Sequence, residues 1–246
     1  MNLIGIIGYP LVQSYSQPYF RQKFSAEYIT DLDYLTFPIT NITKLPNLLA
    51  QHNNLIGLNV TIPYKVQVLA YVHHQTDAVK QIGAANCLAI HNGVITAYNT
   101  DVIGFTNSLK PLLKTQHSHA LILGTGGAAK AVAYSLQQLG ISYTYVSRSA
   151  KVPNSIAYSD VTPILLQQYK LIVNASPSGM VPNEATYPPI PYSALTAQHL
   201  LYDLVYKPAE TIFLQNGITQ GCATKNGYEM LLLQANAGWD IWKTLI

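Results

Sequence analysis

Lys65 is the residue whose position most clearly suggests chemistry. It is the only charged side chain of NVTIPYK, residues 59–65, in a chain of 246 residues of which 10% are charged, against roughly 25% in typical soluble domains. The apolar run before Pro63 predicts a strand, and ligands of open α/β sheets collect at the carboxyl ends of strands. The pattern indicates a lysine that acts on a ligand. The alternative is a surface lysine that opens a helix at 65–74.

Polar side chains recur at the predicted strand ends of the first hundred residues. The set comprises Ser14 and Ser16, Asn59 and Thr61, Asn86, and the run Asn99, Thr100 and Asp101. Hydroxyls, amides, one lysine and one carboxylate suit a small polyhydroxylated substrate. Ser14, Ser16 and Asp101 could instead be helix caps, and Asn86 and Asn99 could be turn residues, but four coincident strand ends favour a site.

A glycine turn follows a later predicted strand. It consists of Gly124, Thr125, Gly126, Gly127 and Ala128. It stands between the apolar run ALIL and an alanine-rich predicted helix, where glycine lets the backbone approach a pyrophosphate and the helix N-terminus offers unpaired N–H groups. The turn predicts a dinucleotide site. The alternative is a structural turn between a strand and a helix.

The end of the next predicted strand bears on which dinucleotide binds. It carries Ser147, Arg148 and Ser149, and the nearest following acid is Asp160. NAD sites usually place Asp or Glu there to hold the ribose 2′-hydroxyl. Because a guanidinium grips phosphate oxygens with its planar donor fork, Arg148 favours NADP, and Lys151 adds charge.

Short apolar runs alternate with helical stretches along the whole chain, which predicts mostly parallel sheets covered by helices. Helices are expected near 17–28, 42–53, 65–74, 102–113, 128–140, 207–217 and 227–246. The hairpin signal Asn92-Gly93 separates two strand-like runs.

Composition excludes several classes of protein. The net charge is +3 without any run of basic residues, which disfavours nucleic-acid binding. Cys87 and Cys222 could in principle pair, but two cysteines in a chain of this length more often are reduced core residues. No apolar run approaches the roughly 18 residues of a membrane span. We expect a soluble cytoplasmic protein without a metal site.

Eight segments, in order, resemble the shikimate dehydrogenase family: SYS, NVTIPYK, GAANC, NTD, GTGGAAKAV, NASPSGM, YDLVYKP and GYEMLLLQA. The resemblance spans essentially the whole chain, and NVTxPxK followed by NTD is its most specific part. It implies reversible, NADPH-dependent reduction of 3-dehydroshikimate to shikimate, within chorismate and aromatic amino-acid biosynthesis.

The resemblance also implies roles for individual residues. The substrate carboxylate would be held by Ser14 and Ser16, with Tyr206 near it. The hydroxyls and ring would be held by Thr61, Lys65, Asn86, Asp101 and Gln234. The pyrophosphate would lie on Gly124 to Ala128, and Ser147, Arg148 and Ser149 match the family's Asn-Arg-Thr. The nicotinamide would lie near Gly227 and Met230, and Asp77 would also approach the cofactor.

The chain departs from the family pattern at a few positions. Cys87 replaces a common threonine, and Ser147 and Ser149 replace asparagine and threonine. The segment 149–173 is short and contains two prolines, where the family fits a fuller helix and a second basic residue. This difference bears on the tightness of NADP binding and not on the position of its site.

The fold class expected is α/β with two domains. Residues 1–102 would form a mostly parallel substrate domain, completed by a C-terminal helix at 227–246. Residues 103–226 would form a Rossmann-type dinucleotide domain. Catalysis would take place in the cleft between them, in a monomer or homodimer with a small-molecule substrate and neither nucleic acid nor membrane as partner.

Lys65 and Asp101 are the candidates for moving a proton at the alcohol oxygen, since hydride transfer there requires one. A nearby carboxylate favours the charged lysine and burial favours the neutral one, and the sequence leaves the outcome open. Our hypothesis is that Lys65 exchanges the proton and Asp101 orients it and the substrate.

Three other functions stay open at this point. They are a quinate/shikimate dehydrogenase that uses NAD, a non-catalytic nucleotide-sensing module, and a tetrahydrofolate-linked dehydrogenase. Ser14, Ser16 and Arg148 favour shikimate and NADP.

Overall fold

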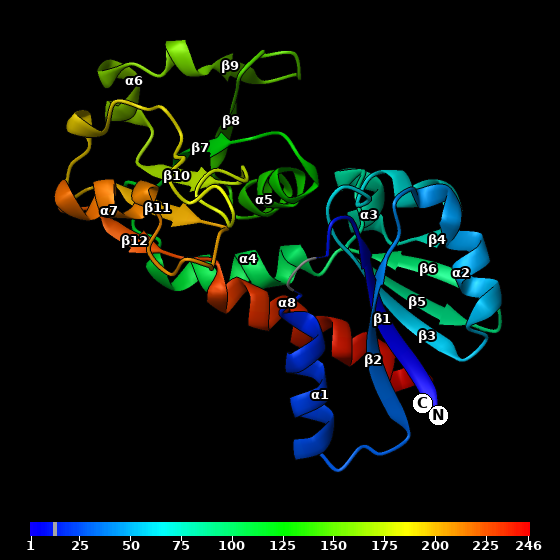
Figure 1. The fold of residues 1–246 in the computed structure, drawn as a ribbon. Helices are drawn as coiled ribbons and strands as arrows, with labels where there is room; N and C mark the ends of the chain where they lie inside the picture. The colour runs from blue at the N-terminus through cyan, green and yellow to red at the C-terminus, as the bar shows by residue number, and fades with distance from the viewer. Residues whose placement is uncertain (12–13) are drawn as a thin grey trace. The chain divides into compact units, whose positions relative to one another are not determined.

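The structure is a computed structural model that describes residues 1–11 and 14–246. The described chain forms two compact units. The first unit consists of Met1–Thr100 and Ala235–Ile246, and the second unit of Asp101–Gln234. Figure 1 shows one sheet with its helices in each unit.

The first unit contains the following elements, with η marking 3-10 helices: β1 (Asn2–Gly8), α1 (Ser16–Ala26), β2 (Leu32–Pro38), η1 (Ile42–Lys44), α2 (Leu45–Gln51), β3 (Leu55–Val60), η2 (Gln67–Tyr71), β4 (His74–Gln75), α3 (Asp77–Ile82), β5 (Cys87–His91) and β6 (Val94–Tyr98). Its sheet has the order β2-β1-β3-β5-β6-β4. The strands β1, β2 and β3 are parallel, and β5 runs antiparallel to β3 and β6.

Helices cover both faces of this sheet because side chains of successive strand residues alternate between the faces. Leu3 and Ile7 of β1 pack with η1, α2 and α3, whereas Ile4 and Ile6 pack with α1 and the chain's last helix. Two buried apolar layers therefore enclose the sheet and hold its strand ends in place.

The second unit begins with α4 (Asp101–Leu109) and continues with η3 (Lys110–Leu112), β7 (His119–Leu123), α5 (Gly127–Gln138), β8 (Ser142–Ser147), β9 (Ser155–Ala157), η4 (Tyr158–Asp160), α6 (Pro163–Gln168), β10 (Leu171–Asn174), η5 (Tyr192–Ala194), β11 (Leu200–Asp203), α7 (Ile212–Thr219) and β12 (Ala223–Lys225). All its strands are parallel, in the order β9-β8-β7-β10-β11-β12. In chain order this is 3-2-1-4-5-6, the doubly wound dinucleotide-binding arrangement. The prediction of an α/β fold with a Rossmann-type sheet is confirmed.

The last helix, α8 (Tyr228–Trp242), is followed by η6 (Lys243–Leu245). Its residues up to Gln234 belong to the second unit, and those from Ala235 belong to the first. In the first unit, Trp242 is fully buried against Phe20 and its indole N–H donates to the Leu88 carbonyl at 2.8 Å.

One predicted helix differs from the structure, and one predicted shortening agrees with it. The helix expected at 65–74 is wrong, because only the 3-10 helix η2 forms there, and Val66, the residue before it, provides no side-chain cap. Its valines also have lower helix propensity than unbranched residues. Between β8 and the parallel strand β9 the chain has only residues 148–154, so the fuller helix of the family has no room there.

Among the helices of the described residues, none combines the length and the hydropathy that a membrane span requires.

Candidate functional site

The segments that follow β1 and β3 lie side by side beyond the sheet of the first unit. The Thr61 N–H donates to the Ile7 carbonyl at 3.0 Å, and the Tyr9 N–H donates to the Ile62 carbonyl at 3.0 Å. A Cβ on Gly8 would overlap the Thr61 methyl group. The strand ends that carry the predicted serine pair and the NVTIPYK segment therefore share one edge, as expected for parallel neighbours.

Tyr34 connects two of the predicted residues at this edge. Its hydroxyl donates to Asn59 Oδ1 at 2.7 Å. Complete burial raises the pKa of the Tyr34 phenol, and a hydrogen bond with Ser16 opposes that shift. Ser16 opens α1 and is itself buried. The sequence predicts no role for Tyr34, because its partners are distant in the chain.

Asn86 joins three strand ends of the first unit. Its Nδ2 donates to Thr100 Oγ1 at 2.9 Å, and its Oδ1 accepts from the Thr100 N–H at 2.6 Å. Its own backbone N–H donates to the Tyr98 carbonyl, while its carbonyl accepts from the Val60 N–H at 2.8 Å. The amide side chain thereby fixes the backbone that leads into Asp101, the residue after Thr100.

Lys65 is half-buried and its backbone is fixed from the same edge. Its carbonyl accepts from the Ala85 N–H at 2.8 Å, and Asn99 Nδ2 donates to the neighbouring Ala84 carbonyl at 2.9 Å. Within the described structure, Ser14 Oγ and Asn99 Oδ1 are buried without a hydrogen-bond partner. Such oxygens cost free energy unless water or a ligand donates to them, so this edge has polar groups for a ligand to satisfy.

Asp101 and Gln234 occur on neighbouring helices of the second unit. Asp101 is the buried first residue of α4, and Gln234 is buried on α8. A Cβ on Gly104 would lie 2.6 Å from the Met230 carbonyl and 3.0 Å from Gln234 Cβ. Glycine at this position therefore lets α4 and α8 approach closely, one turn from Asp101. Lys65 belongs to the other unit, and its joint action with Asp101 stays a prediction.

The glycine turn fits a pyrophosphate. Gly124 has φ +115°, which favours glycine, and a Cβ there would lie 3.0 Å from the Ala175 carbonyl oxygen. A Cβ on Gly126 would meet nothing within 4 Å, and α5 begins without a side-chain cap. The unpaired N–H groups of an uncapped helix N-terminus, with free space beside them, suit the binding of an anion.

The predicted 2′-phosphate residues form a tight turn after β8. Ser147 Oγ accepts from the Ala150 N–H at 3.0 Å, so this serine shapes the turn. Arg148 and Ser149 are exposed. Burial raises the pKa of the Tyr158 phenol, and the Arg148 guanidinium opposes that shift, which identifies Tyr158 as a neighbour of Arg148.

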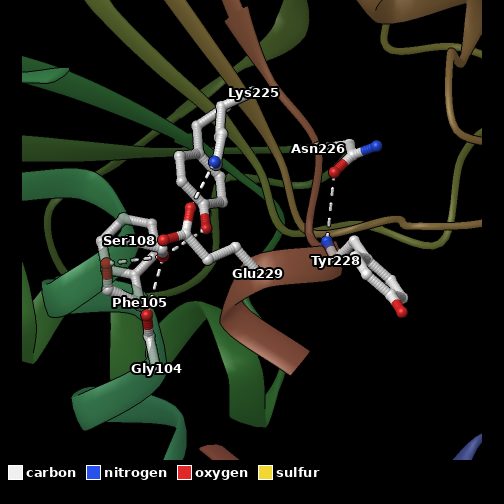
Figure 2. A network of polar contacts seen from close by, with 8 residues as sticks. Gly104, Phe105, Ser108, Lys225, Asn226, Tyr228 and Glu229 are labelled. Atoms are coloured by element: carbon white, nitrogen blue, oxygen red, sulfur yellow. Dashed lines mark hydrogen bonds and ion pairs between the residues drawn. The ribbon is translucent and has the colours of Figure 1, made fainter. Parts of the chain in front are cut away.

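Gly227 lies where β12 passes into α8. A Cβ there would overlap the Leu204 carbonyl oxygen, and the Gly227 N–H donates to the Val205 carbonyl at 3.1 Å. Asn226 Oδ1 accepts from the Tyr228 N–H at 3.2 Å. Figure 2 shows this contact beside the ion pair of Lys225 with Glu229. These contacts hold the turn against the loop after β11.

Three other predicted residues have unremarkable surroundings. Met230 is buried in the core with Phe105. Asp77 is 89% exposed and pairs with Lys80 at 3.2 Å. Tyr206 is half-buried after β11, and burial raises its pKa. No group of three or more His, Cys, Asp or Glu side chains in the described ranges could hold a metal ion.

Comparison with known proteins places this geometry in a family. A family profile described as the shikimate dehydrogenase substrate binding domain matches residues 6–88. The shikimate dehydrogenase (NADP(+)) of Carboxydothermus hydrogenoformans is 35% identical over 98% of this chain and 91% of its own length. The chain belongs to the shikimate dehydrogenase family. The predicted family is thereby confirmed.

Two solved members of the shikimate dehydrogenase family share the fold. The Listeria monocytogenes enzyme, in complex with shikimate and NAD, has a TM-score of 0.88 at 25% identity, covering 99% of this chain and 92% of that one. The Thermus thermophilus enzyme, in complex with NADP(H) and shikimate, has a TM-score of 0.87 at 25% identity, covering 100% and 95%.

Proposed function

We propose that the chain is an oxidoreductase that reversibly reduces 3-dehydroshikimate to shikimate with NADPH. The carrying observation is the buried network of Asn86 and Thr100 that fixes the backbone entering Asp101. Membership of the shikimate dehydrogenase family supports a substrate of this class at this edge, a ring with one carboxylate and several hydroxyls.

We assign substrate binding to side chains of the first unit, together with Tyr206 and Gln234 of the second unit. Ser14 and Ser16 supply hydroxyl groups for the carboxylate, and Tyr206 supplies a phenol. Thr61, Asn86 and Gln234 supply groups for the ring hydroxyls, because hydroxyl and amide groups can both donate and accept hydrogen bonds. The partnerless oxygen of Ser14 supports this assignment.

We assign NADP to the second unit. The uncapped N-terminus of α5 and the open space at Gly126 support pyrophosphate binding, and exposed Arg148 supports recognition of the 2′-phosphate. When bound, NADPH supplies the hydride. Gly227, whose backbone packs closely against Leu204, and Met230 are assigned to the nicotinamide. Asp77 stays the weakest of the predicted contacts.

Lys65 and Asp101 carry the proton step in this proposal. Lys65 gives a proton to the oxygen that becomes the alcohol and takes it back in the reverse direction. Asp101 orients Lys65 and the substrate. A half-buried lysine with a fixed backbone supports this role, since a general acid must be held within hydrogen-bond reach of its target.

The domain assignment follows as part of the proposal. Residues 1–102, completed by 227–246, bind substrate, and residues 103–226 bind the dinucleotide. Cys87 and Cys222 are buried thiols that are not joined in a disulfide, which supports a reducing, cytoplasmic location. We further propose a monomer or homodimer, which sedimentation of the purified chain would distinguish.

A steady-state assay of NADP reduction with shikimate tests the function. We expect turnover with shikimate and NADP, and much weaker turnover when quinate replaces shikimate or NAD replaces NADP. Preference for NAD and quinate would favour the quinate/shikimate alternative. Nucleotide binding without any turnover would favour the sensing module.

A further inference from the structure

Asp203 is a fully buried carboxylate to which the sequence predicts no role. It ends β11 and accepts three hydrogen bonds. Asn174 Nδ2 donates to its Oδ1 at 2.9 Å, and the Val205 N–H donates to the same oxygen at 3.0 Å. Thr211 Oγ1 donates to its Oδ2 at 2.6 Å. One side chain therefore joins the end of β10, the loop after β11 and the residue that caps α7.

The hydrogen bond from Asn174 connects Asp203 to the glycine turn through residues 174–176. Asn174 Oδ1 accepts from the Ser176 N–H at 3.1 Å and from Ser176 Oγ at 2.6 Å. A Cβ on Gly124 would lie 3.0 Å from the Ala175 carbonyl oxygen and 3.1 Å from the Ser176 nitrogen. The backbone that Asn174 shapes is thus in contact with the turn proposed to hold the pyrophosphate.

The hydrogen bond from Val205 connects Asp203 to the turn at Gly227, at the other end of the proposed dinucleotide site. The Val205 carbonyl accepts from the Gly227 N–H at 3.1 Å, and the neighbouring Leu204 carbonyl leaves no room for a side chain at Gly227. Thr211, the third donor to Asp203, packs against the loop after β10, since a Cβ on Gly179 would lie 3.1 Å from the Thr211 side chain. Asp203 therefore has short contact paths to both Gly124 and Gly227.

The environment of Asp203 determines its charge. Burial raises the pKa of its carboxyl group to about 6, and the hydrogen bonds from Thr211, Val205 and Asn174 oppose that rise. Asp203 also acts on the Tyr192 phenol. Burial is the main cause that raises the pKa of Tyr192, and Tyr187, Tyr158 and Asp203 raise it further. At neutral pH the carboxylate is ionised and can accept all three bonds.

We propose that Asp203 is a positioning residue for the dinucleotide site, holding the glycine turn and the Gly227 turn at the spacing that the cofactor requires. This inference rests on the proposed function, since it takes the second unit to bind NADP. Asp203 touches no reacting atom in this role. It acts through the backbone of residues 174–176 and 204–205.

The test is the dissociation constant for NADP of the Asp203→Asn variant, measured by titration calorimetry without substrate. The amide keeps the shape of the side chain but puts an NH₂ group where one carboxylate oxygen accepted, so one of the three donors loses its acceptor. At about pH 7.5 we expect binding to weaken about tenfold, the usual scale for a lost buried bond to a charged group.

Tyr202→Phe is the matched control, because Tyr202 precedes Asp203 on β11 and its side chain points to the opposite face. It also loses one buried bond, its hydroxyl lying 2.6 Å from Ser108 Oγ. Ser108 keeps its own bond to the Gly104 carbonyl at 2.7 Å (Figure 2). We expect unchanged NADP affinity in Tyr202→Phe.

The pH dependence separates positioning from general destabilisation. Near pH 5 the wild-type carboxyl is protonated and resembles the amide, so the tenfold ratio between variant and wild type should fall toward about two. The NADP phosphate itself titrates near pH 6, which affects both proteins and cancels in the ratio.

An unchanged dissociation constant in Asp203→Asn, or a ratio that stays constant with pH, would overturn the inference. Thr211→Val removes one donor and serves if Asp203→Asn does not fold, with about threefold weaker binding expected; unchanged binding there would count equally against it. If the wild-type protein itself binds no NADP, the proposed function fails, which is a different result.

Discussion

Each unit has a buried polar junction at one edge of its sheet, beside the strand ends, and the two junctions differ in charge. In the first unit Asn86 both donates to and accepts from Thr100, so the junction is neutral. In the second unit Asp203 accepts three donors, so the junction carries a negative charge. Similar positions on two α/β sheets can therefore respond differently to pH.

The difference follows from what each junction must join. An amide carries both a donor and an acceptor, and the Thr100 backbone and hydroxyl together offer the matching pair. Around Asp203 the groups from Asn174, Val205 and Thr211 are all donors, and an anion with two oxygens satisfies them without help. We expect titration to affect the Asp203 junction of the second unit and to leave the Asn86 junction unchanged.

Lys65→Ala should give the largest effect on activity. Loss of the proposed proton donor should lower kcat by about a thousandfold, with NADP affinity unchanged because the residue belongs to the first unit. Steady-state kinetics and an NADP titration measure both quantities. Lys44→Ala, an exposed lysine of the same unit, is the control, and turnover near wild type in Lys65→Ala would remove Lys65 from the mechanism.

Stability should depend on pH through Asp203. Its folded pKa of about 6 lies above the ordinary value of 3.8, so the folded state binds more protons between these values. Stability therefore falls as pH rises through that window, by about 3 kcal/mol in total from this group.

Urea unfolding of wild type and Asp203→Asn between about pH 4 and pH 7 measures this contribution as a difference. Burial lowers the pKa of His117 and His199, which makes acid destabilising through these groups in both proteins. A pH-independent difference between the two proteins would contradict the charged junction.

Asn86→Ala and Asn174→Ala should separate the two units. Each removes a buried amide whose partners lose hydrogen bonds, so each should lower the free energy of unfolding by about 2 kcal/mol. Asn86→Ala should raise KM for shikimate alone, and Asn174→Ala should weaken NADP binding alone. Equal effects on both ligands in either variant would mean that the junctions do not act locally.

Arg148→Ala should give the smallest of these effects. Loss of an exposed guanidinium should weaken NADP binding about tenfold, while NAD binding, which lacks the 2′-phosphate, should not change. Titrations with both nucleotides measure the ratio, with Lys110→Ala as the control for lost surface charge. Equal loss for NAD would show that Arg148 does not read the phosphate.

Local signals in the sequence predicted the parts of the fold that local physics decides. Asn92 and Gly93 both have positive φ in the hairpin of β5 and β6, as an Asn-Gly turn requires. The glycine turn also lies between a strand and a helix as predicted. The helix expected at 65–74 failed because the apolar spacing of that segment did not compensate for its missing cap and its valines.

The polar junctions could not be predicted in this way. Tyr34 and Asn59 are 25 residues apart, and Asn174 and Asp203 are 29 residues apart, so only the assembled sheets bring them together. The segments NASPSGM and YDLVYKP contain both members of the second pair, yet neither shows which donor meets which acceptor. The sequence showed that the segment after β8 is short, but it did not predict the turn in which Ala150 and Asn154 have positive φ.

The division of α8 has a consequence for synthesis on the ribosome. The aromatic layer of Phe20, Phe24 and Tyr34 in the first unit is completed by Trp239 and Trp242, from the other end of the chain. That layer has an open apolar side until residue 242 has emerged, whereas the sheet strands of the second unit are complete by Lys225. The unit translated first is therefore the one that finishes folding last, and in the interval its apolar face is open to chaperones and to aggregation.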